Sequence, residues 1–169
     1  MTKNFICGSK KYEVGGLKMD TIGLPVSLFD LPEKIEVEGY TLFLRTSFHV
    51  SLVCIGKIIE KNNLNIPDFI QKIIADFYEF TQHMNIDFVQ YKNDFRFATE
   101  GEKRSVVVMC DISNLDKFFD LINKKYSLHL EYPPTHVTLY TLQPVAGIFL
   151  TDTDSINRLT KKIKAPVKL

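Results

Sequence analysis

Phe48-His49-Val50-Ser51-Leu52 is the stretch around which the rest of the chain is interpreted, because Thr135-His136-Val137-Thr138-Leu139 repeats its pattern 87 positions later. In each copy a histidine stands two residues before a hydroxyl side chain, and the residues between and after them are aliphatic. If both copies are β-strands, successive side chains point to opposite faces of the sheet. The histidine and the hydroxyl of each copy then share one face of their strand.

This arrangement suits chemistry on a phosphate. Two residues of strand rise separate the histidine and the hydroxyl by roughly 6.5–7 Å at the backbone, so both side chains can reach different oxygens of one phosphate. Each strand offers one acid/base group, His49 or His136, and one phosphate anchor, Ser51 or Thr138. In-line phosphoryl transfer needs a proton acceptor on one side and a proton donor on the other. A lone histidine in an apolar strand is more often structural, but the repeated pattern favours catalysis.

Composition limits the class of protein. With 169 residues, 45% of them hydrophobic and 24% charged, the chain suits one globular domain or two small lobes that share a core. A net charge of +1 argues against a broad basic surface for long nucleic acids but is compatible with a small or terminal phosphate ligand. Three widely spaced cysteines indicate neither a disulfide framework nor a zinc knuckle. Without a signal peptide or an apolar run of about 20 residues, a cytoplasmic protein is expected.

Hydrophobic periodicity predicts the secondary structure. Residues 1–36 are interrupted too often by glycine and proline for long elements; they suggest a short strand around Phe5–Cys7 and a surface loop over the site. The expected strands are Val37–Leu44, His49–Ile55, two short strands within Ile86–Thr99 joined by a turn at Asn93-Asp94, Ser105–Cys110 and Thr135–Leu142. The expected helices are 66–81, 115–126 with a capping box at Ser113–Asp116, and a C-terminal helix within 151–169 that carries Ile156, Leu159 and Ile163.

The order of these elements places one motif strand in each half of the chain. We therefore expect an α+β fold of two pseudo-symmetric lobes, each an antiparallel β-sheet flanked by helices, with an active-site cleft between them. Residues 1–169 would form a single such domain.

The two motifs resemble those of the 2H phosphoesterases, a family named for two H-x-[S/T]-x motifs that includes RNA 2′,3′-cyclic phosphodiesterases, also called 2′-5′ RNA ligases. His49-Val50-Ser51-Leu52 followed by Ile55-Gly56-Lys57 is similar to the first motif strand and its exit turn, and Ser105–Tyr140 is similar to the second half. The resemblance covers roughly residues 38–145 and leaves the N-terminal segment and the C-terminal helix unmatched. Ser51 replaces the commoner threonine but keeps a hydroxyl.

The resemblance implies a phosphodiesterase that needs no metal or cofactor. His136 would be the general base and His49 the general acid, although the near symmetry of the motifs leaves the reverse assignment open; Ser51 and Thr138 would hold phosphate oxygens. The first expected substrate is a 2′,3′-cyclic phosphate on an RNA end or a nucleotide. Signalling nucleotides, such as cyclic dinucleotides or 2′-5′ oligoadenylates, are the alternative substrates, and a non-catalytic nucleotide- or RNA-binding module is the alternative function. A monomer without a membrane partner is favoured.

Further residues are candidates for substrate contact. Tyr140 would share the strand face of His136 and Thr138, and Arg45 lies just before the first motif. The additional phosphate-binding candidates are Arg96 and Arg104, and the base-stacking candidates are Phe43, Tyr91, Phe95 and Phe97, each with a structural role as the alternative. His83 and His129 lack the motif and receive no role. The absence of H-E-x-x-H from the sequence disfavours a two-histidine metal site.

Overall fold

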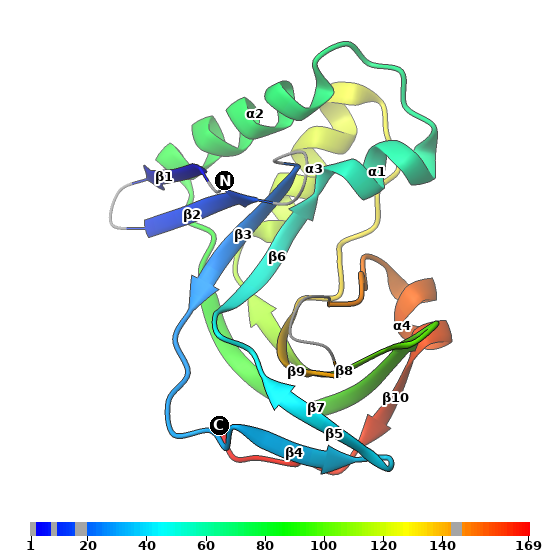
Figure 1. The fold of residues 1–169 in the computed structure, drawn as a ribbon. Helices are drawn as coiled ribbons and strands as arrows, with labels where there is room; N and C mark the ends of the chain where they lie inside the picture. Colours follow the sequence, from blue (N-terminus) through cyan, green and yellow to red (C-terminus); the bar gives the residue numbers. More distant parts are fainter. Residues whose placement is uncertain (1–2, 8–9, 16–19, 143–146) are drawn as a thin grey trace. The chain divides into compact units, whose positions relative to one another are not determined.

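The computed structural model in Figure 1 describes residues 3–7, 10–15, 20–142 and 147–169. Within these ranges the fold is of the predicted α+β class, with ten strands and four helices. The strands are β1 Lys3–Cys7, β2 Lys10–Gly15, β3 Thr21–Val26, β4 Lys34–Val37, β5 Tyr40–Leu44, β6 Phe48–Cys54, β7 Phe88–Glu100, β8 Lys103–Ile112, β9 His136–Thr141 and β10 Thr160–Ile163. The helices are α1 Ile55–Asn62, α2 Phe69–His83, α3 Leu115–Tyr126 and α4 Thr153–Leu159.

The chain forms two compact units, and each takes segments from both halves of the sequence. The first unit contains Met1–Pro25, Ser51–Phe88 and Ile112–Pro133, and the second contains Val26–Val50, Val89–Asp111 and Pro134–Leu169. The prediction of one lobe per half of the chain, each with its own motif, is therefore wrong. Both motif histidines belong to the second unit, because β6 passes from the second unit into the first only after Val50.

The first unit packs α2 and α3 through an aromatic core. The ring of Phe77 contacts Tyr12 at a centroid distance of 5.0 Å and Phe118 at 5.2 Å, both edge to face. The buried Tyr12 hydroxyl donates to the carbonyl of Ile86 over 3.0 Å, so β2 is fixed to the chain that follows α2. The apolar stripes that the sequence predicts for both helices are buried as expected. No helix in the described ranges is long and apolar enough to cross a membrane.

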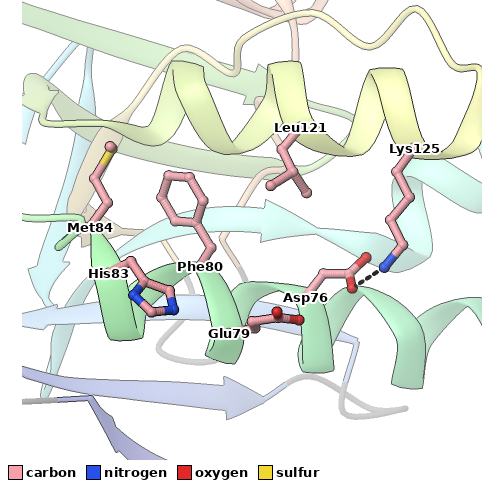
Figure 2. A pocket seen from close by; sticks show the side chains of 7 residues that line it. All are labelled: Asp76, Glu79, Phe80, His83, Met84, Leu121 and Lys125. Atoms are coloured by element: carbon pink, nitrogen blue, oxygen red, sulfur yellow. Dashed lines mark hydrogen bonds and ion pairs between the residues drawn. The ribbon is translucent and has the colours of Figure 1, made fainter.

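A hollow between α2 and α3 is shown in Figure 2. Asp76 lies in it, 8% exposed, and accepts hydrogen bonds from the Lys125 ammonium at 2.6 Å and the Tyr126 hydroxyl at 2.7 Å. The other lining residues are Glu79, Phe80, His83, Met84 and Leu121. Because both donors come from α3 and Asp76 lies in α2, these hydrogen bonds join the two helices.

The second unit is built on the start of β6 and on β9, β8, β7 and β10, which are hydrogen-bonded neighbours in that order. The β4–β5 hairpin also joins β9, with Phe43 opposite Thr141 and Leu44 opposite Tyr140. Every pairing in this unit whose register is known is antiparallel. Its core includes an apolar cluster of Ala98, Val107, Met109, Ile148, Leu150 and Ile156.

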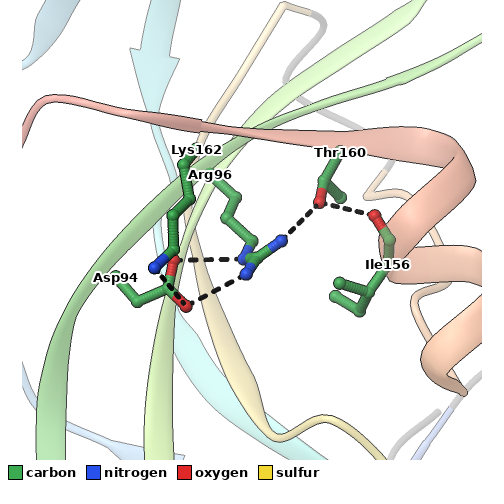
Figure 3. A network of polar contacts seen from close by, with 5 residues as sticks. All are labelled: Asp94, Arg96, Ile156, Thr160 and Lys162. Carbon is green, nitrogen blue, oxygen red and sulfur yellow. Dashed lines mark hydrogen bonds and ion pairs between the residues drawn. The ribbon is translucent and has the colours of Figure 1, made fainter.

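A polar network attaches β10 to β7, as Figure 3 shows. The Arg96 guanidinium donates twice to the Asp94 carboxylate at 3.1 Å and once to the Thr160 hydroxyl at 3.3 Å. Thr160 in turn donates to the carbonyl of Ile156 at 2.7 Å, and the Lys162 ammonium lies 3.9 Å from Asp94. The Arg96 guanidinium is thus occupied by Asp94 and Thr160. Its candidacy for phosphate binding required a guanidinium that is free to bind the phosphate.

Several predicted elements differ from the structure. Residues 37–44 are not one strand but the second half of a hairpin, since Glu38 and Gly39 adopt φ of 54° and 79°, the pair of positive values typical of a two-residue type I′ turn. The predicted turn at Asn93-Asp94 is absent, and β7 continues through it. Helix α1 directly follows the first motif strand and was not predicted.

The two ends of the chain also differ from expectation. Residues before 34 include three short strands, β1 to β3, and β1 at Lys3–Cys7 contains the strand that was predicted around Phe5–Cys7. The C-terminal helix ends at Leu159, and Ile163 lies in β10. The helix begins with a capping box, in which an Asp152 carboxylate oxygen accepts from the Ser155 amide at 2.7 Å. The helix 115–126 is confirmed, but its cap, Asn114, makes no side-chain capping bond.

Candidate active site

The two motif strands lie side by side in the second unit. β6 and β9 pair antiparallel with Val50 opposite Val137. Continuing this register by one residue places His49 opposite Thr138, and residues opposed in this way have Cβ atoms roughly 4.5–5.5 Å apart and share a face. His136, two residues before Thr138 on β9, is the diagonal neighbour of His49 on that face, at roughly 7–8 Å. We call this side of the sheet the histidine face.

The His136 ring is held in one orientation by the backbone. Its Nδ1 lies 2.9 Å from the carbonyl oxygen of Pro134, so Nδ1 carries the proton and donates it to this oxygen. The other ring nitrogen, Nε2, then keeps its lone pair, and it has no hydrogen-bond partner among the described residues. Burial lowers the pKa of His136, the Pro134 carbonyl opposes this, and the charge of His49 lowers it further. His136 is therefore a neutral base near pH 7.

His49 and Thr138 occupy more open positions. His49 is exposed, so its imidazole can exchange protons with water. Thr138 is partly exposed, and no described residue hydrogen-bonds its hydroxyl. A Cβ built on Gly147 would stand 4.0 Å from the Thr138 Oγ1 atom, so the segment that leads to Leu150 passes beside this hydroxyl.

Ser51 lies two residues after His49 on β6, so both side chains point to the same face of the strand. In the division into units, Ser51 begins the segment Ser51–Phe88 of the first unit. Its hydroxyl bonds the Cys54 thiol. Burial, the main cause, raises the pKa of Cys54 to about 11, and the bond with Ser51 acts in the opposite direction. The thiol therefore stays protonated and unreactive at neutral pH.

Tyr140 does not share the histidine face, contrary to the prediction. Along β8, Val107 opposes Thr138 and Val106 opposes Tyr140, so Leu139 is an extra residue, a β-bulge. Because Val106 and Val107 point to opposite faces, Thr138 and Tyr140 do as well. The Tyr140 side chain is 0% exposed, and its hydroxyl donates to the Pro32 carbonyl at 2.9 Å. The shared face on which its substrate-binding assignment was based is therefore wrong. The sequence could not show this, because a bulge leaves no mark in its pattern.

Arg45 stays close to the motif. Its amide donates to the carbonyl of the bulged Leu139 at 2.9 Å, which continues the pairing of β5 along β9 by one residue. Because side chains alternate along a strand, Arg45 lies on the same face of β5 as Phe43. Phe43 is the residue opposite Thr141. Arg45 thus remains a candidate for phosphate contact.

The other sequence candidates divide into core and surface residues. Arg104 lies over the ring of Tyr40 at 5.1 Å and donates to the backbone of its own turn. Phe95 and Phe97 are buried, and Phe97 stacks on Tyr40. Burial, with a contribution from Cys110, raises the pKa of Tyr91 to about 12. Phe43 is the base-stacking candidate with an accessible ring, 48% exposed.

One contact of the candidate site was not predicted: the carbonyl of Pro134 that orients the His136 ring. Its only signal in the sequence is the Pro133-Pro134 pair, which delivers an extended chain into the motif strand. For cofactors, the described ranges contain no group of three or more His, Cys, Asp or Glu side chains placed to hold a metal ion. Comparisons of the chain with protein-family models, with curated proteins and with solved structures found no match.

Proposed function

We propose that the protein is a phosphodiesterase of the 2H type that opens a 2′,3′-cyclic phosphate on a nucleotide or an RNA end. The observation that carries this proposal is the pairing of the two motif strands through Val50 and Val137, which sets His49 opposite Thr138. His136 shares this face as the diagonal neighbour of His49, two residues before Thr138 on β9. This face presents two titratable groups and a hydroxyl without a hydrogen-bond partner among the described residues, at spacings that match a single phosphate.

The two histidines suit different steps. His136 is neutral near pH 7 and keeps a free Nε2 lone pair, so it acts as the base that takes a proton from the attacking water. His49 donates a proton to the departing ribose oxygen and regains one from solvent, to which it is exposed. The bond from water oxygen to phosphorus forms as the bond from phosphorus to the 3′ oxygen breaks, and a 2′-phosphate results.

The hydroxyls position the phosphate. Thr138 donates to a non-bridging oxygen, and Ser51 is proposed to do the same after leaving Cys54. Arg45 adds positive charge beside the motif strand. None of these steps requires a metal ion, so the proposal includes turnover in the presence of a chelator.

The test is hydrolysis in EDTA of a panel of 2′,3′-cyclic mononucleotides, RNA with a 2′,3′-cyclic phosphate end, cyclic dinucleotides and 2′-5′ oligoadenylate. His49→Ala and His136→Ala should each lower kcat about 10²–10⁴-fold. His129→Ala, which removes an exposed histidine outside both motifs, is the matched control and should leave kcat unchanged.

Three results would change the proposal. Preference for a signalling nucleotide would keep the mechanism and replace the substrate. Binding of a nucleotide without turnover would favour the non-catalytic module. Activity that survives both histidine substitutions would refute the two-histidine mechanism.

A further inference from the structure

Two buried hydroxyls on the histidine face lack hydrogen-bond partners. Ser105 on β8 and Thr141 on β9 are 0% and 1% exposed, and neither side-chain oxygen has a partner within the described part of the chain. Buried polar side chains are rarely left in this condition in native proteins. Each such group therefore needs an explanation, such as a functional role or a bound water molecule or ion.

Strand registers place this pair on the same face as the catalytic groups. Ser105 opposes Thr141, and Val107 opposes Thr138. Ser105 and Val107 are two residues apart on β8 and therefore share a face. Thr141 thus returns to the histidine face after the bulge at Leu139. Its separation from Thr138 along β9 is three residues, roughly 7–10 Å.

An exposed aromatic ring completes the row. Phe43 on β5 opposes Thr141, so Phe43, Thr141 and Ser105 lie across three neighbouring strands on the histidine face. Aromatic rings of this kind bind nucleobases by stacking, with little dependence on the base. Along β9, the histidine face therefore offers phosphate chemistry at His136 and Thr138 and then two hydroxyls beside an aromatic ring.

We propose that Ser105, Thr141 and Phe43 form the subsite for the nucleoside part of the substrate. This inference rests on the proposed phosphodiesterase function. One polar atom of the ribose or the base bonds both hydroxyls, and the base packs on Phe43. The subsite selects nucleotides over cyclic phosphates that lack a base and acts through binding, without contact with the reacting atoms.

The test compares kcat and KM of wild type, Ser105→Ala, Thr141→Val and the double variant on two substrates. These are the best 2′,3′-cyclic mononucleotide and glycerol 1,2-cyclic phosphate, which lacks a base. Removing each hydroxyl should raise KM for the nucleotide about 3- to 10-fold with kcat unchanged, the effect of one lost hydrogen bond. KM for the glycerol compound should not change. Phe43→Ala should likewise raise KM for the nucleotide and leave KM for the glycerol compound unchanged.

Thermal unfolding without ligand is the second measurement. Because neither hydroxyl has a partner in the free protein, the double variant should be as stable as wild type or more stable. Thr81→Val is the matched control: Thr81 is 1% exposed and donates to the Phe77 carbonyl at 2.9 Å, so its loss should lower Tm without changing KM. A double variant with lower Tm and unchanged nucleotide KM would show that the hydroxyls bind a structural water only, and would overturn the subsite.

Failure of the proposed function gives a different result. If wild type hydrolyses no member of the panel, the Kd of the 2′,3′-cyclic mononucleotides is measured by calorimetry for wild type and the double variant. Weaker binding by the double variant would support the subsite without catalysis. Equal binding, or none by either protein, would overturn it.

Discussion

Replacing Tyr140 by phenylalanine separates a structural from a functional interpretation of this residue. The ring stays in place, so no cavity forms, but the hydrogen bond of 2.9 Å from the hydroxyl to the Pro32 carbonyl is lost. A lost hydrogen bond costs about 1 kcal/mol, and the unpaired carbonyl can raise this toward 3 kcal/mol. At about 2–4 °C per kcal/mol for a protein of this size, Tyr140→Phe should lower Tm by roughly 2–12 °C.

The assay combines thermal unfolding with the kinetics of the best nucleotide substrate. Burial raises the pKa of Tyr140, so the residue is a neutral phenol throughout the working range of pH. We expect KM and kcat to stay within about twofold of wild type, because the bulge at Leu139 turns Tyr140 away from Thr138. An unchanged Tm with a several-fold higher KM would refute this reasoning and restore Tyr140 as a substrate contact.

Three other predictions concern charge and packing. Burial lowers the pKa of His136 below its ordinary 6.5, so the unfolded chain binds more protons just below pH 6.5. The free energy of unfolding should therefore fall as pH drops below about 6.5, and His136→Gln should remove that part of the dependence in urea titrations at several pH values. Arg96→Met, which releases Thr160 from β7, should cost about 1–2 kcal/mol and speed amide exchange in β10, whereas exchange rates equal to wild type would contradict the role of the network. Asp76→Asn should cost about 1–2 kcal/mol in urea unfolding, a range reduced because Lys125 is half exposed; an unchanged midpoint would show that the pair contributes nothing.

Local patterns predicted the elements that carry the site. Alternation of apolar and polar residues located both motif strands to within about one residue, since each has one buried side. Helical periodicity located α2 and α3 because their apolar stripes face an aromatic core. The signals failed where backbone geometry departs from the regular period: a bulge at Leu139, a turn at Glu38-Gly39 and a short helix directly after β6.

The division into units was beyond local patterns for a different reason. Which strands become neighbours depends on contacts between residues far apart in the chain, and two similar motifs invite the assumption of two similar lobes. The structure instead pairs the motif strands with each other through Val50 and Val137. The repeat correctly indicated that the two motifs lie near each other, but both histidines belong to one unit and not to two similar lobes.

That pairing explains why a repeat of H-x-[S/T]-x can form one site. In an antiparallel pair centred on the two middle residues, Val50 and Val137, the histidine of the first motif stands opposite the hydroxyl of the second. The proposed phosphate anchor beside His49 is therefore Thr138, which comes from the other motif. A slip of one residue in this register would exchange the two faces of β6 and turn His49 toward the side where Val50 is buried. The aliphatic residues of both motifs thus favour this register, and the register aligns the proposed catalytic groups.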